Sequence, residues 1–421
     1  MTTARYLIGD VFDRMAELED GSVDLIMTSP PFLALRSYLP ADHPDKAKEI
    51  GSETTPAEFI DTLLRLTAEW GRLLAPHGSI CVELGDTYSG SGGGGGDYYE
   101  GGRRAGQPGF TGSASPSRDE LREANARHAR EKNAQRDGWP LAKSLCGIPT
   151  LYAWSLAYGR NLLTGEPSPA GKWRIRNLVA WVRPNPPVGA LGDKFRPATS
   201  FLTIATRARD RYFDLDAVRT PSEDTRPRNT NGPKALGHDD PAHMRKYDTR
   251  TTNPAGAPPL DWWHIPPGGY EGAHYAVYPE ALCVRPIEAM CPHRVCTTCG
   301  EPSRRIAETT NAVGKATGRR AWRENGSDGV GAGHSGEFVE KVSSAPTAER
   351  VTLGWSDCGH GTWRPGHVLD PFAGSGTTLA VAVGHGRAAT GIDIDARNAD
   401  LARERIGMFL TIDNPNTEVT S

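Results

Sequence analysis

Residues 368–395 read VLDPFAGSGTTLAVAVGHGRAATGIDID, a pattern typical of a strand, a glycine-rich turn, a helix and a second strand. Gly374 and Gly376 allow the backbone to turn sharply and to approach a ligand at the amino terminus of the helix. No Lys follows Gly376, so the turn lacks the signature of a phosphate-binding loop. Leu379 stands where a dinucleotide-binding fingerprint has its third glycine. Taken alone, the segment also fits a turn with only a structural role.

Two acidic residues stand at the end of the second predicted strand. Asp393, followed by Asp395, occupies the place at which a doubly wound nucleotide-binding fold holds a ribose diol. The acidic strand end, together with the absence of a phosphate-binding Lys, favours a nucleoside ligand without phosphate groups. We expect Asp393 to bind the ribose and regard Asp395 as the second choice.

The amino-terminal part of the chain also alternates between strands and helices. Apolar residues recur every three or four positions in the predicted helices and form short runs in the predicted strands. This order predicts an α/β fold with a parallel sheet and helices on its faces. The predicted strands span 6–10, 23–28, 78–86, 176–187 and 201–208, and the predicted helices span 11–21, 56–78 and 151–163.

The composition excludes several classes of protein. The formal net charge is −3, so a nucleic-acid site has to be a local basic patch. The seven cysteines are odd in number and unevenly spaced, which argues against a secreted disulfide scaffold. The first residues lack the pattern of a signal peptide, and no stretch is apolar enough to span a membrane. We therefore expect a protein of the reducing cytoplasm with no membrane partner.

Residues 24–32, DLIMTSPPF, end a predicted strand in two prolines. Proline cannot donate to a β-ladder and fixes its own φ, so Pro30 and Pro31 stop the strand rigidly. The break presents the Ser29 hydroxyl, the Pro30 carbonyl and the Phe32 ring. The alternative is a rigid strand end without a chemical role.

Both motifs resemble those of one family. DPFAGSGTT resembles the S-adenosylmethionine-binding motif of the amino-methylating DNA methyltransferases, and TSPPF resembles their catalytic motif. The catalytic motif comes first here, as in the circularly permuted group called the beta class. HYAVYPEAL (274–282) and YLIGDVFDRMAEL (6–18) are similar to other segments of that group. The resemblance implies a doubly wound, Rossmann-like methyltransferase sheet of the seven-stranded type in a single domain, with circularly permuted motif order and loop insertions.

The resemblance also assigns site residues. It implies that Ser29, Pro30, Pro31 and Phe32 are catalytic, with Ser29 Oγ and the Pro30 carbonyl accepting hydrogens of an exocyclic amine. Phe32 would stack on a base flipped out of the duplex. The cofactor-binding residues that it implies are Asp10, His274, Tyr278, Pro279, Asp370, Pro371, Phe372, Ala373, Gly374, Ser375, Gly376, Thr377, Thr378 and Asp393.

The resemblance predicts the target base from the first residue of the catalytic motif, which is Ser29 here. The family pattern favours N4 of cytosine when that residue is Ser and N6 of adenine when it is Asp or Asn, so N4-cytosine is favoured and N6-adenine is the alternative. Methylation at cytosine carbon 5 is excluded, because it requires a Pro-Cys dipeptide that the chain lacks. More remote alternatives are an RNA methyltransferase, a protein-amide methyltransferase and a DNA-binding module without activity.

The motifs and composition divide the chain into parts. We assign 1–88 and 141–208 to the catalytic half and 263–300 and 361–412 to the cofactor-binding half, with a flexible Gly-rich and charged insertion at 89–140 and a disordered tail at 413–421. Residues 209–262 are the candidate target-recognition region. Its basic and amide residues are Arg211, Arg219, Arg226, Arg228, Asn229, Asn231, Lys234, Arg245, Lys246 and Arg250. The expected partners are double-stranded DNA and, in a restriction–modification pair, an endonuclease; a monomer and a homodimer both remain open.

A cysteine cluster defines a further insertion at 291–360. Cys296 and Cys299 have the spacing of a zinc knuckle, and Cys358 and His360 complete a tetrahedral set. We predict a structural zinc ion on these four residues, with Cys291 and His293 as substitutes. The alternative is a set of reduced thiols, which is the reading we favour for Cys81, Cys146 and Cys283.

Overall fold

The computed structural model describes residues 2–35, 38–39, 42–89, 98–99, 103–104, 137–186, 193–220, 254–267, 278–310 and 349–415. The chain forms two compact units. The larger unit comprises residues 1–217, 260–304 and 357–421, and the smaller unit comprises residues 218–259 and 305–356. None of the helices in the described ranges is both long and apolar enough to cross a bilayer.

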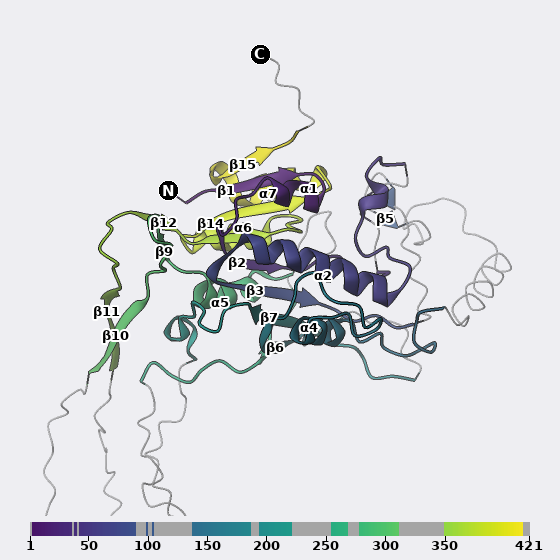
Figure 1. Cartoon of the computed structure of the whole chain (residues 1–421), viewed down its shortest axis with the longest axis horizontal. Coiled ribbons are helices and arrows are strands. Elements are labelled where there is room, and N and C mark those ends of the chain that lie inside the picture. The colour runs from purple at the N-terminus through teal and green to yellow at the C-terminus, as the bar shows by residue number, and fades with distance from the viewer. Residues whose placement is uncertain are drawn as a thin grey trace, which may run out of the picture. The chain divides into compact units, whose positions relative to one another are not determined.

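The larger unit is built on one sheet (Figure 1). Every neighbouring pair of strands is parallel except the two pairs formed by β7, which runs against both β3 and β6. The strands lie in the order β15 (Leu410–Asp413), β1 (Ala4–Ile8), β14 (Ala388–Asp393), β13 (His367–Asp370), β2 (Val23–Thr28), β3 (Leu74–Leu84), β7 (Thr199–Thr206), β6 (Arg174–Val182) and β8 (Trp262–His264).

The sheet has nine described strands, two more than the seven-stranded type expected from the resemblance. The additional strands are the edge strands β15 and β8, which are too short to show a period in the sequence. β15 ends at Asp413, where the disordered tail was predicted to begin, and residues 416–421 lie outside the described ranges.

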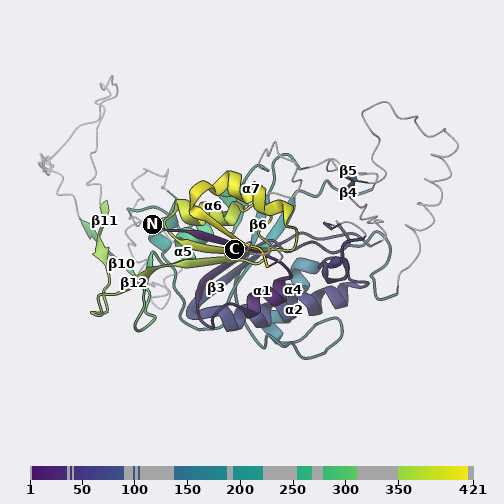
Figure 2. The same cartoon turned by 90° about the horizontal axis from the view of Figure 1, so that it is seen from above.

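Helices cover both faces of the sheet (Figure 2). This arrangement confirms the predicted α/β, doubly wound Rossmann-like fold. One face carries α1 (Val11–Ala16), α2 (Pro56–Leu73) and α4 (Ile148–Tyr158), and the other carries α5 (Glu280–Met290), α6 (Thr377–Gly384) and α7 (Arg397–Ile406).

Helix α2 shows how the sequence sets these boundaries. Thr55 and Glu58 form a capping box at its amino terminus, and Pro56 begins the helix. The sequence predicted a helix within 56–78 that stops at Pro-His-Gly (76–78), whereas the helix ends at Leu73 and the chain enters β3 directly. Pro76 explains the difference, since the residue before a proline disfavours the helical conformation.

The remaining strands form small ribbons, each described by itself. β9 (Arg294–Cys296) pairs with β12 (Trp363–Pro365) in the larger unit, and β10 (Arg305–Thr310) pairs with β11 (Glu349–Trp355) in the smaller one. The two-residue strands β4 (Tyr98–Tyr99) and β5 (Arg103–Arg104) also pair, within the predicted 89–140 insertion. Short 3-10 turns occur at Lys46–Lys48, Leu215–Val218 and Gly407–Phe409. The predicted domain boundaries stay a prediction.

Candidate functional site

The carboxyl ends of four adjacent strands, β1, β14, β13 and β2, meet at one edge of the sheet. The chain order reverses between β13 and β2, because β14 follows β13 on one side and β3 follows β2 on the other. Ligands of open α/β sheets bind at such a switch point. The two sequence motifs begin at this point, since the glycine-rich turn follows β13 and Ser29 follows β2.

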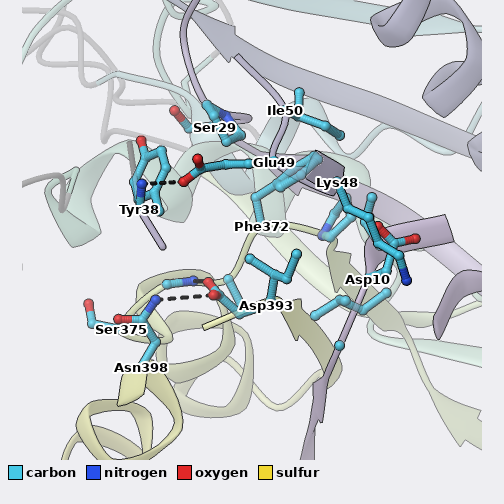
Figure 3. Close-up of a pocket in the computed structure, with 18 of the residues that line it drawn as sticks. Asp10, Ser29, Tyr38, Lys48, Glu49, Ile50, Phe372, Ser375, Asp393 and Asn398 are labelled. Carbon is cyan, nitrogen blue, oxygen red and sulfur yellow. Dashed lines mark hydrogen bonds between the residues drawn. The ribbon is translucent and has the colours of Figure 1, made fainter. Parts of the chain in front are cut away.

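A pocket opens at this edge (Figure 3). It encloses about 840 Å³ of empty space, including its open mouth. Its walls come from the ends of the four strands, the start of α1 and the segment 38–50. The lining residues are Gly9, Asp10, Val11, Ser29, Pro31, Tyr38, Lys48, Glu49, Ile50, Tyr278, Pro371, Phe372, Ala373, Gly374, Ser375, Thr377, Ile392, Asp393, Ile394 and Asn398.

The glycine-rich turn that follows β13 is held by contacts with β14 and β1, which lie on one side of that strand. Gly374 and Gly376 both have positive φ, of 52° and 77°, which glycine adopts without strain. The Gly374 amide donates to Asp393 Oδ2 at 2.8 Å, and its carbonyl accepts from the Tyr6 hydroxyl at 2.7 Å. A Cβ on Gly376 would lie 3.0 Å from Ala402 Cβ, so α7 packs tightly against the turn.

Asp370, at the end of β13, connects the glycine-rich turn to neighbouring elements through hydrogen bonds. Its carboxylate accepts hydrogen bonds from the hydroxyls of Thr28, Tyr278 and Thr378 at 2.7, 3.0 and 2.5 Å. The side chain is fully buried, and burial raises the pKa of Asp370 against the opposing effect of these hydrogen bonds. Asp370 therefore joins β2, β13 and α6 and does not itself line the pocket.

Asp393 lies on the pocket wall at the end of β14. Its Oδ2 accepts from the Gly374 amide, and its Oδ1 accepts from the Asp395 amide at 2.8 Å and from Asn398 Nδ2 at 3.1 Å. Burial raises the pKa of Asp393 to about 6. Asp395, the second choice in the sequence, binds Arg397 at 2.8 Å and is not among the lining residues.

Ser29 lies at the edge of the same pocket and has a partner that the sequence analysis missed. Its hydroxyl donates to Glu83 Oε2 at 2.6 Å. Glu83 comes from β3 and is 3% exposed, and burial raises the pKa of its carboxyl group. The signal that could have found it is an acid within the otherwise apolar run SICVELG, next to β2 in a parallel sheet.

The other residues of the proline motif differ in their position. Pro31 lines the pocket, whereas Pro30 is buried and Phe32 is half-buried, and neither of these two is a lining residue. The Phe32 ring packs against the chain at Gly85, where an added Cβ would lie 2.5 Å from Phe32 Cε2. Gly85 therefore makes room for this ring.

The pocket gathers most, though not all, of the predicted cofactor residues. Asp10 lines it and also caps α1, accepting from the amides of Phe12 and Asp13. Tyr278, Pro371–Ser375, Thr377 and Asp393 line it as well. The predicted residues that do not line it are Pro279, Asp370, Gly376 and Thr378. His274 lies outside the described residues.

The segment 38–50 supplies pocket residues that sequence reasoning assigned no role. Glu49 accepts hydrogen bonds from the backbone amides of Tyr38 and Leu39 and forms an ion pair with Lys46 at 2.8 Å. These contacts fix Tyr38 on the pocket wall opposite Asp393 (Figure 3). No periodic pattern marks the segment, so the sequence held no signal for it.

The pocket fits a nucleoside with an uncharged or cationic attachment. Its buried Ser375 hydroxyl finds no hydrogen-bond partner in the described part of the chain, so it is available to a ligand. The carboxylates of Asp10 and Asp393 line the pocket and can accept from hydroxyl or ammonium groups. The lining residues thus fit S-adenosylmethionine, with its ribose and its positively charged sulfonium and amino groups.

The fold and this pocket are those of an α/β protein with a candidate nucleoside site, and comparison with known proteins establishes its family. The chain matches the model of the DNA methylase family of N6- and N4-methyltransferases over residues 23–294 and 360–404. It belongs to this family. It is an S-adenosylmethionine-dependent DNA methyltransferase of the amino-methylating class, as the sequence motifs predicted.

Individual proteins resemble the chain along much of its length. The type II methyltransferase M.SmaI of Serratia marcescens is 22% identical over 407 residues, covering 96% of this chain and 91% of that protein. M.Cfr9I of Citrobacter freundii is 25% identical over 278 residues, covering 66% of this chain and 69% of that protein. Among solved structures, the cytosine-N4-specific PvuII DNA methyltransferase has a TM-score of 0.47 and 11% identity, covering 99% of this chain and 89% of that one.

Proposed function

We propose that this enzyme transfers the methyl group of S-adenosylmethionine to the exocyclic N4 amine of a cytosine flipped out of duplex DNA. The observation that carries the proposal is the Ser29 hydroxyl, which lies at the edge of the pocket and donates to buried Glu83. Ser at this position favours cytosine N4 in the family pattern. N6-adenine is the alternative, and RNA or a protein amide is a more remote one.

The proposed chemistry begins with the low nucleophilicity of the target amine, whose lone pair is delocalised into the ring. Because the Ser29 proton is engaged by Glu83, the lone pairs of Ser29 Oγ remain to accept a hydrogen of the amine. The Pro30 carbonyl is proposed as the acceptor for the second hydrogen. Two such acceptors orient the amine and favour a pyramidal nitrogen. Phe32 is proposed to stack on the flipped base.

When bound, S-adenosylmethionine supplies an electrophilic methyl group on its sulfonium. We propose that Asp393, Asp10, Ser375 and Tyr278 hold the cofactor at the pocket wall, where they lie now. As the new N–C bond forms and the S–C bond breaks, the nitrogen must lose one proton. Ser29 can accept that proton while passing its own to Glu83, whose raised pKa makes it a stronger base than an exposed carboxylate.

Incubation with labelled S-adenosylmethionine and unmethylated genomic DNA, followed by nucleoside analysis, tests the target. We expect label in N4-methylcytosine. Label in N6-methyladenine would replace the proposal with its alternative, and label in RNA or protein but not in DNA would contradict both. The type II methyltransferases among the relatives also support the proposal that the enzyme modifies a defined site and is paired with an endonuclease.

Glu83→Gln tests the proton path. We expect the single-turnover rate to fall about 100-fold or more, the usual contribution of a positioned base. In the wild type the rate should fall as the pH is lowered and Glu83 becomes protonated, and Glu83→Gln should lose this dependence. Glu69→Gln, on the surface of α2, is the matched control. A variant that melts like the wild type and keeps its rate would contradict the role of Glu83.

Target recognition is proposed for residues 209–262, of which 221–253 lie outside the described residues. Two of the basic residues named for it are described, and both have contacts within the protein. Arg211 stacks on the Phe213 ring at 4.5 Å, and burial lowers its pKa to about 10. Arg219 donates to the Gly256 carbonyl at 3.0 Å. The proposal therefore rests on the region rather than on these two residues.

The predicted zinc ion has no part in this reaction. Its four predicted ligands come together, but none of them lines the pocket.

A further inference from the structure

The β9–β12 ribbon brings three sulfurs and one imidazole together in the larger unit. One ligand atom from each of Cys296, Cys299, Cys358 and His360 lies within 4.8 Å of all the others. We propose that these four residues bind a structural zinc ion that fixes the entry of the chain into β13. The proposal does not depend on the methyl-transfer reaction.

The distances fit a tetrahedral site. Zinc lies about 2.3 Å from a cysteine sulfur and about 2.0 Å from a histidine nitrogen, so tetrahedral angles place a sulfur and a nitrogen about 3.5 Å apart. Cys296 Sγ and His360 Nδ1 are 3.6 Å apart. Three cysteines and one histidine form one of the usual donor sets of structural zinc, and soft thiolates disfavour magnesium and calcium.

The backbone turns around the cluster in the manner of a metal knuckle. Gly300, directly after the Cys-x-x-Cys pair, and Gly359, between Cys358 and His360, have φ values of 73° and 84°. Only glycine adopts such values readily, so both turns can be tight. The Thr298 amide donates to Cys296 Sγ at 3.4 Å, which suits a sulfur carrying negative charge.

The segments that hold the two knuckle turns also contact each other directly. β9 and β12 lie side by side (Figure 1), and Trp363 pairs with Cys296 at the end of the ribbon next to the cluster. A hydrogen bond at 3.0 Å links the hydroxyls of Thr298 and Thr362. A metal ion bound by all four residues would join the segment that holds Cys296 and Cys299 to the one that holds Cys358 and His360, and its binding free energy would add to the stability of the fold.

The ribbon continues directly into the core of the enzyme. Arg364 in β12 binds Asp24 of β2 at 2.6 Å, and the His367 amide at the start of β13 donates to the same carboxylate at 2.7 Å. The cluster thus precedes the amino end of β13, whereas the pocket lies at the carboxyl end. We therefore expect the metal to stabilise the fold rather than to touch the cofactor.

Reduced or oxidised thiols are the competing explanation. All seven cysteines of the chain are free in the structure, including the exposed pair Cys299 and Cys358. A zinc ion accounts for the convergence of these two with buried Cys296 and with His360. A disulfide accounts for two of the four residues and leaves His360 without a role.

Metal analysis of the full-length protein, purified without chelators, is the first test. We expect about one zinc ion per chain, released by a mercurial thiol reagent and detected with a chromogenic chelator. This measurement uses the wild type, so it does not depend on whether a variant folds. Folded protein without stoichiometric zinc, another metal in its place, or a disulfide found by intact mass would overturn the proposal.

Cys299→Ser is the second test, with His264→Asn, an exposed histidine of β8, as the control. We expect the variant to bind less than about a fifth of the wild-type zinc and to melt several degrees lower. The control should keep its zinc. At temperatures where Cys299→Ser is still folded, its affinity for S-adenosylmethionine should differ from that of the wild type by less than about twofold. Full zinc in Cys299→Ser would refute the ligand set.

Discussion

Ser29→Ala is expected to lower the rate of methyl transfer at saturating cofactor by about 100- to 1,000-fold, the usual effect of losing one oriented hydrogen-bonding group at a reacting centre. The hydroxyl is the atom proposed to join the target amine to Glu83, 2.6 Å away. The affinity for S-adenosylmethionine should stay within about twofold, because the proposed cofactor contacts belong to other residues. Single-turnover kinetics and calorimetric titration measure the two quantities separately.

Ser22→Ala is the matched control, since Ser22 precedes the same strand β2 at its opposite end and only donates to the Glu19 carbonyl. It should transfer methyl groups at the wild-type rate. If Ser29→Ala instead lost its affinity for the cofactor and kept its rate when saturated, Ser29 would be a binding residue and its proposed role would be wrong.

Asp393→Asn is expected to weaken the binding of S-adenosylmethionine by about 10- to 100-fold, which corresponds to one or two hydrogen bonds to a charged acceptor. The carboxylate lies on the pocket wall, and burial raises its pKa to about 6. Asp400→Asn, on the exposed face of α7, is the control and should bind normally. Unchanged affinity in Asp393→Asn would remove Asp393 from the proposed ribose site.

The raised pKa of Asp393 also predicts the direction of the pH dependence. A ribose diol donates to the ionised carboxylate, so the affinity of the wild type should rise as the pH increases through about 6 and level off above it. The stability of the protein without cofactor should change in the opposite direction and fall as the pH rises. A carboxyl group whose pKa is raised by folding favours the folded state at low pH, and this contribution is lost as the pH rises through about 6.

Binding curves between about pH 5 and about pH 8, and melting curves that extend down to about pH 3.5, measure the two effects. Asp370 and Glu83 also have raised pKa values, so the wild type alone does not identify the titrating group. The difference between the wild type and Asp393→Asn isolates Asp393. If the two proteins show the same pH dependence of binding, another group titrates.

The sequence predicted the fold well, and it contained the two motifs that meet at the candidate pocket, because both rest on local patterns. The glycine turn, the proline break and the alternation of strands and helices are each contained in a few consecutive residues. Their order along the chain, together with the resemblance, predicted the α/β class and the family correctly. The prediction of a parallel, seven-stranded sheet missed the two short edge strands and the antiparallel β7.

The apolar run around Glu83 marks it as an unusual acid, but its contact with Ser29 could not be predicted in the same way, because that contact depends on the register of two strands. β2 and β3 pair in parallel with Thr28 opposite Val82, which brings Ser29 and Glu83 side by side. Asp370 shows the same dependence on tertiary structure. Its motif suggested a cofactor contact. In the structure, four donors surround the Asp370 carboxylate, so the side chain stabilises the glycine-rich turn from within the protein.

The order of the strands has a consequence for synthesis on the ribosome. β1 leaves the ribosome before the other described strands, yet its neighbours in the sheet, β14 and β15, follow after β2, β3, β6 and β7. β13, which separates β1 and β14 from β2, also follows those strands in the sequence. The nascent chain therefore cannot complete its central sheet until β13, β14 and β15 have been synthesised, and a chain terminated before residue 370 lacks the glycine-rich turn altogether.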